Sequence, residues 1–120
     1  MSKTRDAVQI LLQLTLSAIA ILIAQYLLPG VHVMDFFVAI VIAALLALLN
    51  ITVKPILIAL TIPITIMTLG LFLLVINALL ILIAAEIVPG FEVDGFWWAL
   101  VFSLILSLLN AFFGVDWKRN

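Results

Sequence analysis

Four long runs of apolar residues dominate the sequence, and none contains a lysine or an arginine. They cover residues 7–28, 36–53, 56–85 and 96–113. Each is close to or above the roughly 18 to 20 residues that a helix needs to cross ~30 Å of hydrocarbon. In lipid every backbone N–H and C=O group needs an internal partner, so such continuous runs form helices, whereas barrel strands would alternate. The sequence therefore predicts an all-α integral membrane protein with four transmembrane helices.

The composition agrees with a membrane location. Hydrophobic residues make up 68% of the chain and charged residues 9%, against about half and about a quarter in soluble domains. The chain has no cysteine, which excludes disulfides, thiol catalysis and cysteine-ligated metals. The lipid bilayer is the expected partner, and no nucleic-acid contact is expected.

The basic residues gather at the two ends and the middle of the chain, and this pattern predicts the orientation. They are Lys3, Arg5, Lys54, Lys118 and Arg119. The two Pro-Gly connections carry no basic residue and hold acids instead, namely Asp35, Glu92 and Asp94. With four crossings, both termini and the middle connection share one side, and the positive-inside rule places them in the cytoplasm.

A cleaved signal peptide is the alternative interpretation of the N-terminal region. Lys3 and Arg5 precede an apolar stretch, and Ala18-Ile-Ala20 resembles a cleavage site. The apolar run, however, continues to Leu28, and its Ile-Leu-Ile-Ala segment at 21–24 recurs at 81–84. The first helix is therefore expected to be retained.

The second half of the chain repeats the first. At a shift of 60 positions, residues 21–50 match residues 81–110 without a gap, and 14 of the 30 pairs are identical. Two apolar helices share many Leu and Ile by chance, but the Pro-Gly pairs at 29–30 and 89–90, and Asn50 with Asn110, are harder to obtain that way. The sequence predicts a tandem duplication of a two-helix unit.

Each predicted unit is a helical hairpin within one membrane domain over residues 1–120. Two crossings per unit make the repeats parallel, whereas inverted repeats of transporters need an odd number, so a transporter is disfavoured. Proline ends each helix and glycine permits the reversal, which predicts tight extracytoplasmic turns. The hairpins are expected at about 7–53 and 70–113.

The third apolar run is too long for one crossing. Its thirty residues would make a helix of ~45 Å and require a tilt of ~48°, beyond the usual range of ~0 to 40°. Pro55 and Pro63 interrupt its first half. Residues 55–68 are therefore predicted to form a short broken segment that is re-entrant or interfacial.

Small residues recur on one side of the second and fourth predicted helices. The two stripes consist of Ala39, Ala43, Ala47 and Asn50, and of Ala99, Ser103, Ser107 and Asn110. Because helices in lipid associate through close approach and hydrogen bonds, the stripes are predicted to pack against each other, within a subunit or across subunits of a homo-oligomer.

Polar residues inside the runs are few and form no recognisable catalytic motif. The chain has one histidine, His32, and no phosphate loop or HExxH pattern. No catalytic, cofactor or metal site and no small-molecule substrate is predicted, and the protein is expected not to be an enzyme. A candidate polar path consists of Thr61, Thr65, Thr68, Asn77 and Glu86, of which Asn77 lies deepest; a structural role is the alternative for the threonines and Glu86.

The segment from Thr61 to Asn77, with T-x-P, T-L-G-L-F and then Asn, resembles the phage holin family called mycobacterial-type four-span holin superfamily IV, which includes chromosomal bacterial members of the YvlD kind. The resemblance extends from about residue 11 to 110. It implies a multi-pass protein of the bacterial inner membrane that oligomerises and permeabilises the bilayer. Two alternatives remain: a small channel or transporter, and an accessory or scaffold subunit in envelope maintenance.

Overall fold

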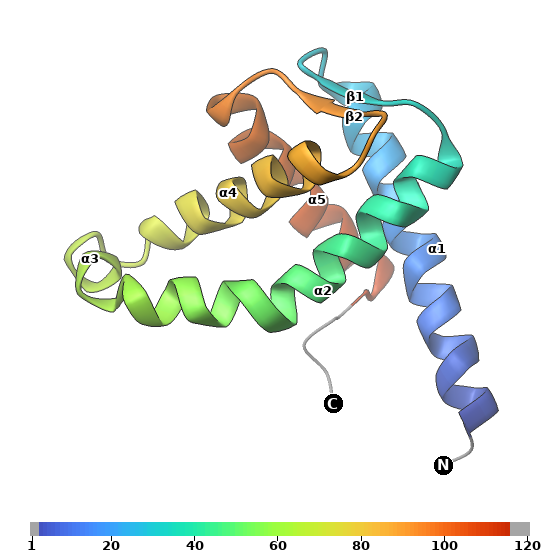
Figure 1. Ribbon diagram of the computed structural model, residues 1–120, viewed down its shortest axis with the longest axis horizontal. Helices are drawn as coiled ribbons and strands as arrows, with labels where there is room; N and C mark the ends of the chain where they lie inside the picture. The colour runs from blue at the N-terminus through green and yellow to red at the C-terminus, as the bar shows by residue number, and fades with distance from the viewer. Residues whose placement is uncertain (1–2, 116–120) are drawn as a thin grey trace.

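A computed structural model describes residues 3–115, and these residues are mostly helical (Figure 1). The elements are α1 (Lys3–Leu27), β1 (Val31–Val33), α2 (Phe36–Leu60), α3 (Ile62–Met67), α4 (Phe72–Ile87), β2 (Phe91–Val93) and α5 (Phe96–Phe113). Helices α1, α2 and α5 are long and apolar enough to cross a membrane, and α4 is a shorter apolar helix. Its 16 residues span only ~24 Å. The structure thus has three candidate spans and a fourth, shorter one.

The two Pro-Gly connections lead into short strands that pair with each other. Strands β1 and β2 are antiparallel, with Val31 opposite Val93, His32 opposite Glu92 and Val33 opposite Phe91. Two further backbone hydrogen bonds extend this ribbon, from Met34 N to Gly90 O (2.9 Å) and from Asp94 N to Gly30 O (2.8 Å). The sequence predicted tight turns at these connections. It did not predict that the two connections pair as a β-ribbon.

The pairing register is symmetric about the centre of the ribbon. The Val31–Val93 pair becomes the Phe91–Val33 pair when each number is shifted by 60, and the two flanking hydrogen bonds exchange in the same way. Within the ribbon, a local twofold axis therefore passes between His32 and Glu92. Tandem duplication in the gene stays a prediction, but this arrangement is the one that parallel repeats would give.

Each long helix contacts two others around this axis. Helix α1 packs against α2 and α5, and α4 packs against α5 and α2, whereas α2 and α5 contact each other at most marginally. Near the ribbon, one alanine of each long helix is fully buried: Ala24, Ala39, Ala84 and Ala99. Small side chains let backbones approach closely in lipid, so the four helices are tightest at the ribbon end.

The middle of the chain differs from the sequence-based expectation. Pro55 does not interrupt the second helix but lies inside α2, which continues to Leu60. Ending a helix leaves four carbonyl groups without partners, whereas continuing past a proline forfeits about one hydrogen bond. Because lipid offers no replacement partners, continuation is the less costly choice.

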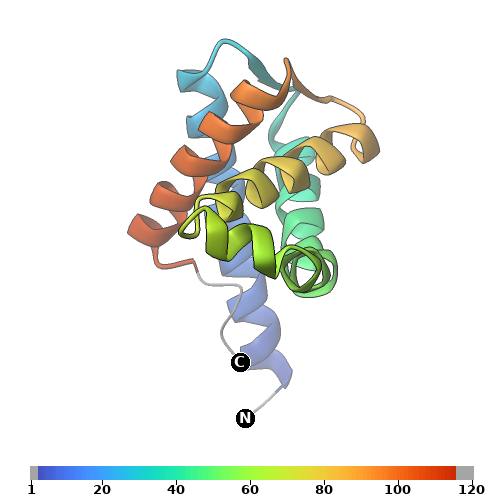
Figure 2. The ribbon, with the colours of Figure 1, turned by 90° about the vertical axis from the view of Figure 1, so that its left-hand side faces the viewer.

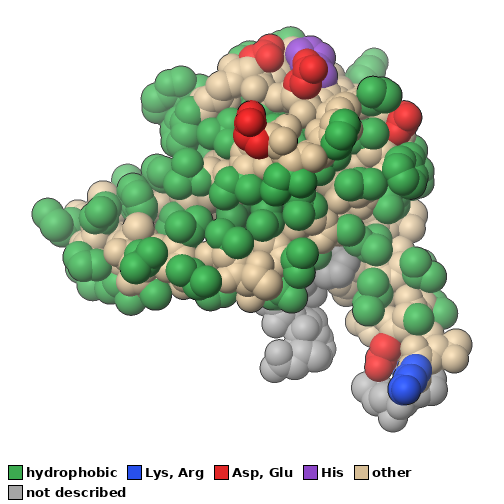
Figure 3. Space-filling view, in the orientation of Figure 1, with side chains coloured by type: hydrophobic (Ala, Val, Ile, Leu, Met, Phe, Trp, Pro, Cys, Tyr) green, Lys and Arg blue, Asp and Glu red, His purple; other side chains and the backbone are tan. Residues whose placement is uncertain are grey.

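The chain reverses between α3 and α4 at residues with positive φ. Leu69 has a φ of 56° and Gly70 a φ of 90°. The distal half of α2, α3 and the first turns of α4 form an arm, residues 55–74, that leads away from α1 and α5 (Figures 1 and 2). The arm has no charged residue, and most of its large apolar side chains are exposed (Figure 3), with Leu69 93% exposed. Whether the arm is re-entrant or interfacial stays a prediction.

Candidate functional site

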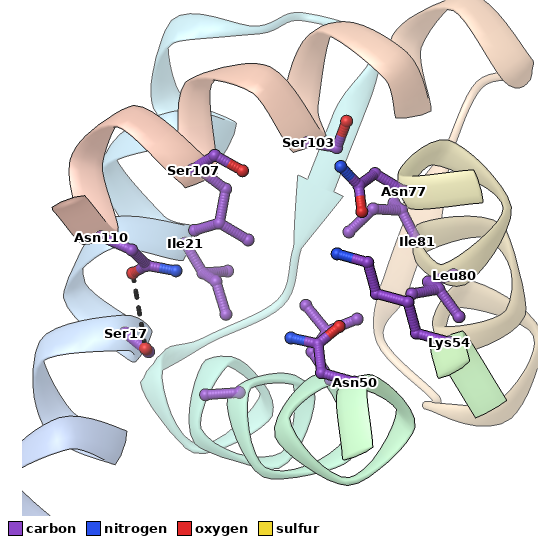
Figure 4. A pocket seen from close by; sticks show the side chains of 13 residues that line it. Ser17, Ile21, Asn50, Lys54, Asn77, Leu80, Ile81, Ser103, Ser107 and Asn110 are labelled. Carbon is purple, nitrogen blue, oxygen red and sulfur yellow. Dashed lines mark hydrogen bonds between the residues drawn. The ribbon is translucent and has the colours of Figure 1, made fainter. Parts of the chain in front are cut away.

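A cavity of about 100 Å³ lies among helices α1, α2, α4 and α5 (Figure 4). Its lining consists of Ser17, Ile21, Ala43, Leu46, Asn50, Lys54, Asn77, Leu80, Ile81, Ser103, Leu106, Ser107 and Asn110. Seven of these thirteen side chains are polar, in a chain that is 68% hydrophobic. Such a concentration inside the helix bundle makes the cavity the candidate functional site.

Helical spacing brings these residues to one place. On α2, positions 43, 46, 50 and 54 lie on one face, and on α5, positions 103, 106, 107 and 110 do so. Helix α1 contributes residues 17 and 21, four apart, and α4 contributes residues 77, 80 and 81. Each long helix therefore turns a mixed polar and apolar stripe toward the shared axis.

The lining follows the same shift of 60 positions as the ribbon. Ten of the thirteen residues form five pairs, which are Ser17 with Asn77, Ile21 with Ile81, Ala43 with Ser103, Leu46 with Leu106, and Asn50 with Asn110. Lys54 breaks the symmetry, because its counterpart Gly114 ends α5 in a left-handed conformation. The cavity is therefore nearly symmetric in shape but carries its positive charge on one side.

Lys54 lies on α2 and not in a connection between helices. Its side chain is half-buried, and its ammonium group points into the cavity toward Asn77, with Asn50 one turn earlier on α2 (Figure 4). The sequence predicts Lys54 in the connection between the second and third apolar runs, and this is wrong because α2 continues past Pro55. Its cytoplasmic side stays a prediction. The structure therefore makes Lys54 a cavity residue.

A hydrogen bond across the cavity joins the first and last helices. Ser17 Oγ donates to Asn110 Oδ1 at 3.4 Å, and Ser17 is only 3% exposed. The Ser103 hydroxyl instead donates to the Leu100 carbonyl of its own helix at 2.8 Å. Asn110 is thereby oriented with its carbonyl oxygen toward α1 and its NH2 group toward the cavity (Figure 4).

Replacing Ser17 with alanine is expected to lower the free energy of unfolding by about 0.6 kcal/mol, the typical value of an interhelical hydrogen bond in lipid. The matched control is Thr15→Ala, because Thr15 is exposed and bonds only the Leu11 carbonyl of its own helix. Chemical unfolding in detergent micelles would measure both variants. Equal losses would show that the contact with Asn110 contributes nothing specific.

An apolar layer lies on the ribbon side of the cavity, because Ile42 and Phe102 each precede the first cavity residue of their helix and Phe91 belongs to β2. Ile42, Phe91 and Phe102 are fully buried, and the Phe91 and Phe102 rings lie 5.9 Å apart between centroids. At the other side, the cavity reaches the subunit surface, because Ser107 is exposed. Among the described residues, the polar lining thus lies on the side of the cavity away from the ribbon, and apolar side chains lie on the ribbon side.

The predicted packing stripes face each other across this cavity. Five of their eight members line it: Ala43, Asn50, Ser103, Ser107 and Asn110. Ala39 and Ala99 are fully buried nearer the ribbon, and Ala47 is half-buried. Within a subunit α2 and α5 contact each other at most marginally, and packing of the stripes along their length stays a prediction. Contact across subunits stays a prediction.

The candidate polar path is not brought together as one route. Asn77 lines the cavity, but Glu86 is exposed near the ribbon end of α4. The Thr61 and Thr68 hydroxyls donate to the carbonyls of Leu57 (2.8 Å) and Thr65 (3.2 Å), so both have a local structural role. The Thr65 hydroxyl is buried in the arm without a hydrogen-bond partner.

Two polar residues of the cavity were not predicted from the sequence as site residues. Lys54 was expected in a connection between helices, and Ser17 lies just outside the matched block 21–50. A signal for Ser17 existed, because it is 60 positions before Asn77 and both are polar in apolar runs. In the part of the chain that the structure describes, no three His, Cys, Asp or Glu side chains gather to hold a metal ion.

Comparison with known proteins adds sequence relatives. The family model described as mycobacterial 4 TMS phage holin, superfamily IV, matches residues 8–112. The chain is 37% identical over 95 residues to the uncharacterized membrane protein YvlD of Bacillus subtilis, covering 78% of this chain and 80% of that protein. It is 47% identical over 81 residues to the uncharacterized protein SCO3922 of Streptomyces coelicolor, covering 61% and 65%. No solved structure matches the chain.

Proposed function

Because the chain belongs to the mycobacterial four-span phage holin superfamily IV, we propose that it is a non-enzymatic protein of the bacterial inner membrane that oligomerises and permeabilises the bilayer. The observation that carries this proposal is the family match over residues 8–112, which covers all five helices except their outermost residues. The resemblance supplies no catalytic residue.

The apolar layer on the ribbon side of the cavity supports assembly of several subunits. In one subunit the fully buried apolar side chains of Ile42 and Phe102 lie on the ribbon side of the first cavity residues of α2 and α5, and Phe91 is a residue of the ribbon itself. A polar route across the bilayer cannot pass through such a layer, since each apolar side chain there excludes water. Permeabilisation therefore requires surfaces from more than one subunit, and the exposed apolar arm is available for contact with neighbours or with lipid (Figure 3).

The charge distribution supports cytoplasmic termini. The acids Asp35, Glu92 and Asp94 lie at the ribbon end of the molecule, and Lys3 and Arg5 lie at the opposite end of α1 (Figure 3). The positive-inside rule favours this orientation. Lys54 lies inside α2 and not in a connection, and Lys118 and Arg119 lie outside the described residues.

The polar cavity favours a small channel or transporter as the second candidate. Seven polar side chains from four helices converge on one space, and polar residues inside membranes commonly mark pathways for ions or substrates. In that case the cavity is half of a pathway whose apolar layer must open. The third reading of the sequence, an accessory scaffold, gains no specific support from the cavity.

Controlled expression beside an endolysin in a bacterial host separates these functions. A holin is expected to collapse the membrane potential abruptly and to release the endolysin, which lysis and a potential-sensitive dye would report. Normal potential at high protein abundance would contradict holin activity. The channel reading predicts slow solute flux in vesicles that is lost in Ser103→Leu, which fills the cavity, and kept in Thr15→Leu on the exposed side of α1.

A further inference from the structure

We propose that the arm, residues 55–74, is a re-entrant element whose tip at Leu69 lies within the hydrocarbon of the bilayer, where acyl chains of lipids cover it. The first argument is the character of its surface. No residue of the arm, all of which the structure describes, is buried, and its sequence carries no charge. Such a contiguous exposed apolar surface requires an apolar partner.

The second argument is that this apolar surface is not confined to one face. On α3 the exposed large side chains are Ile62, Ile64, Ile66 and Met67. A helix turns about 100° per residue, so these positions point to different sides. A helix that docks on a protein has one apolar face, whereas a helix that is apolar all round lies in a protein core or in a membrane. Because α3 is not buried in protein, acyl chains are the partner that fits it.

The third argument is the backbone of the reversal between α3 and α4. Each backbone N–H group of residues 68–74 donates to an acceptor within the arm, at 2.8 to 3.1 Å. The Gly70 N–H donates to the Thr65 carbonyl, and the Phe72 N–H donates to the Thr68 hydroxyl. A turn in water can leave such groups to the solvent, whereas hydrocarbon offers them no partner. The reversal therefore suits a medium without water.

The threonine hydroxyls of the arm agree with this interpretation. The Thr61 and Thr68 hydroxyls donate to carbonyl groups within the arm. The Thr65 hydroxyl is buried although it has no hydrogen-bond partner. In contact with water, a hydroxyl would gain hydrogen bonds by pointing outward. The side-chain polar atoms of the arm are thus bonded or hidden inside it.

The fourth argument is depth. In both ribbon views α1 runs from the N-terminus to the ribbon, and the arm leaves the molecule between these two levels (Figures 1 and 2). Helix α4 has 16 residues and spans ~24 Å, less than the ~30 Å of hydrocarbon. It also runs obliquely to α1 (Figures 1 and 2). A helix that began at the water surface would fall short, whereas one that begins at a tip inside the hydrocarbon reaches the ribbon side.

Site-directed spin labelling measures the depth of the tip, and the chain suits it because it contains no cysteine. The full chain with Leu69→Cys carries a nitroxide at the tip and is reconstituted in vesicles of phosphatidylethanolamine and phosphatidylglycerol. Ile19→Cys, exposed on the candidate span α1, is the hydrocarbon reference, and Glu92→Cys, exposed on the ribbon, is the water reference. Collisions of the label with oxygen, which dissolves in hydrocarbon, and with a water-soluble nickel chelate report the medium.

The label at Leu69→Cys is expected to collide with oxygen as often as the label at Ile19→Cys and to be shielded from the nickel chelate. A water-soluble maleimide is expected to react with the free thiol of Leu69→Cys at least about tenfold more slowly than with that of Glu92→Cys, because hydrocarbon disfavours the reactive thiolate.

Two results overturn the proposal. Nickel collisions as frequent as at Glu92→Cys would place the tip at the water interface. Low access of both oxygen and nickel would show that protein covers the tip, and dipolar broadening between labels would identify that protein as a second copy. Should Leu69→Cys fail to fold, Met67→Cys on α3 decides in its place, and nickel access there overturns the proposal equally. These measurements do not depend on permeabilisation, which the expression experiment tests separately.

Discussion

Replacing Gly30 with alanine is expected to destabilise the protein by about 3 kcal/mol, the upper part of the usual cost of overpacking. A Cβ atom on Gly30 would overlap the ring atoms Cγ, Cδ2 and Cε2 of Trp98. Cγ attaches the indole to the side chain, and Cδ2 and Cε2 are shared by its two rings. The clash is therefore relieved only by moving the whole ring or the ribbon. Thermal unfolding in detergent, followed by tryptophan fluorescence, measures the loss.

The second half of the chain supplies the control for this prediction. Val38 occupies the position equivalent to Trp98, and a Cβ atom on Gly90 would meet Val38 and Met34 at 3.2 Å. Gly30→Ala should therefore be tolerated much better when Trp98 is also replaced by valine. A double variant that is no more stable than Gly30→Ala with Trp98 intact would show that the indole ring is not the cause.

The apolar runs and the Pro-Gly breaks predicted most of the helical architecture correctly. Helices α1 and α5 begin and end within a few residues of their predicted bounds, because long apolar runs in lipid must be helical. Pro29 follows the end of α1, and Gly114 ends α5. The ribbon was missed for two reasons. A three-residue strand is too short to show a period of two, and its partner lies about 60 residues away in the chain.

The small-residue stripes show where reading one helix at a time fails. Ala39 and Ala99 are fully buried near the ribbon, as close packing requires. One to three turns further, the equivalent pairs Ala43 with Ser103 and Asn50 with Asn110 line the cavity instead. The stripe continues in the sequence, but its residues change from full burial near the ribbon to lining of the cavity. Whether a small residue of the stripe is packed against another helix or lines the cavity depends on how the helices are arranged, which the sequence of one helix does not determine.

The prediction that Lys54 lies in a loop was wrong, although both its charge and the proline after it favoured a loop. A lysine before a proline in an apolar chain is typical of a loop between helices. The backbone, however, has no water to satisfy the carbonyl groups that an earlier helix end would expose. The helix therefore continues, and the lysine is carried into the cavity (Figure 4).

Phe102 offers the second large effect, since replacing it with alanine is expected to cost about 3 kcal/mol, the low end for phenylalanine in a core. Phe102 is fully buried and packs against Phe91 with ring centroids 5.9 Å apart. In lipid the transfer term is small, because hydrocarbon also surrounds the unfolded helix. The lost van der Waals contacts and the new cavity remain, and these set the expected size.

Phe112→Ala is the matched control, because Phe112 lies on the same helix and is 86% exposed. Its replacement should change the free energy of unfolding by no more than about 0.5 kcal/mol. Equal effects of the two variants would contradict the buried layer. The same pair distinguishes the functional candidates: if one subunit conducts, removing the Phe102 ring joins the cavity to the ribbon side and raises ion flux in vesicles. If conduction needs several subunits, Phe102→Ala weakens the protein without raising flux, because the route does not pass through this layer.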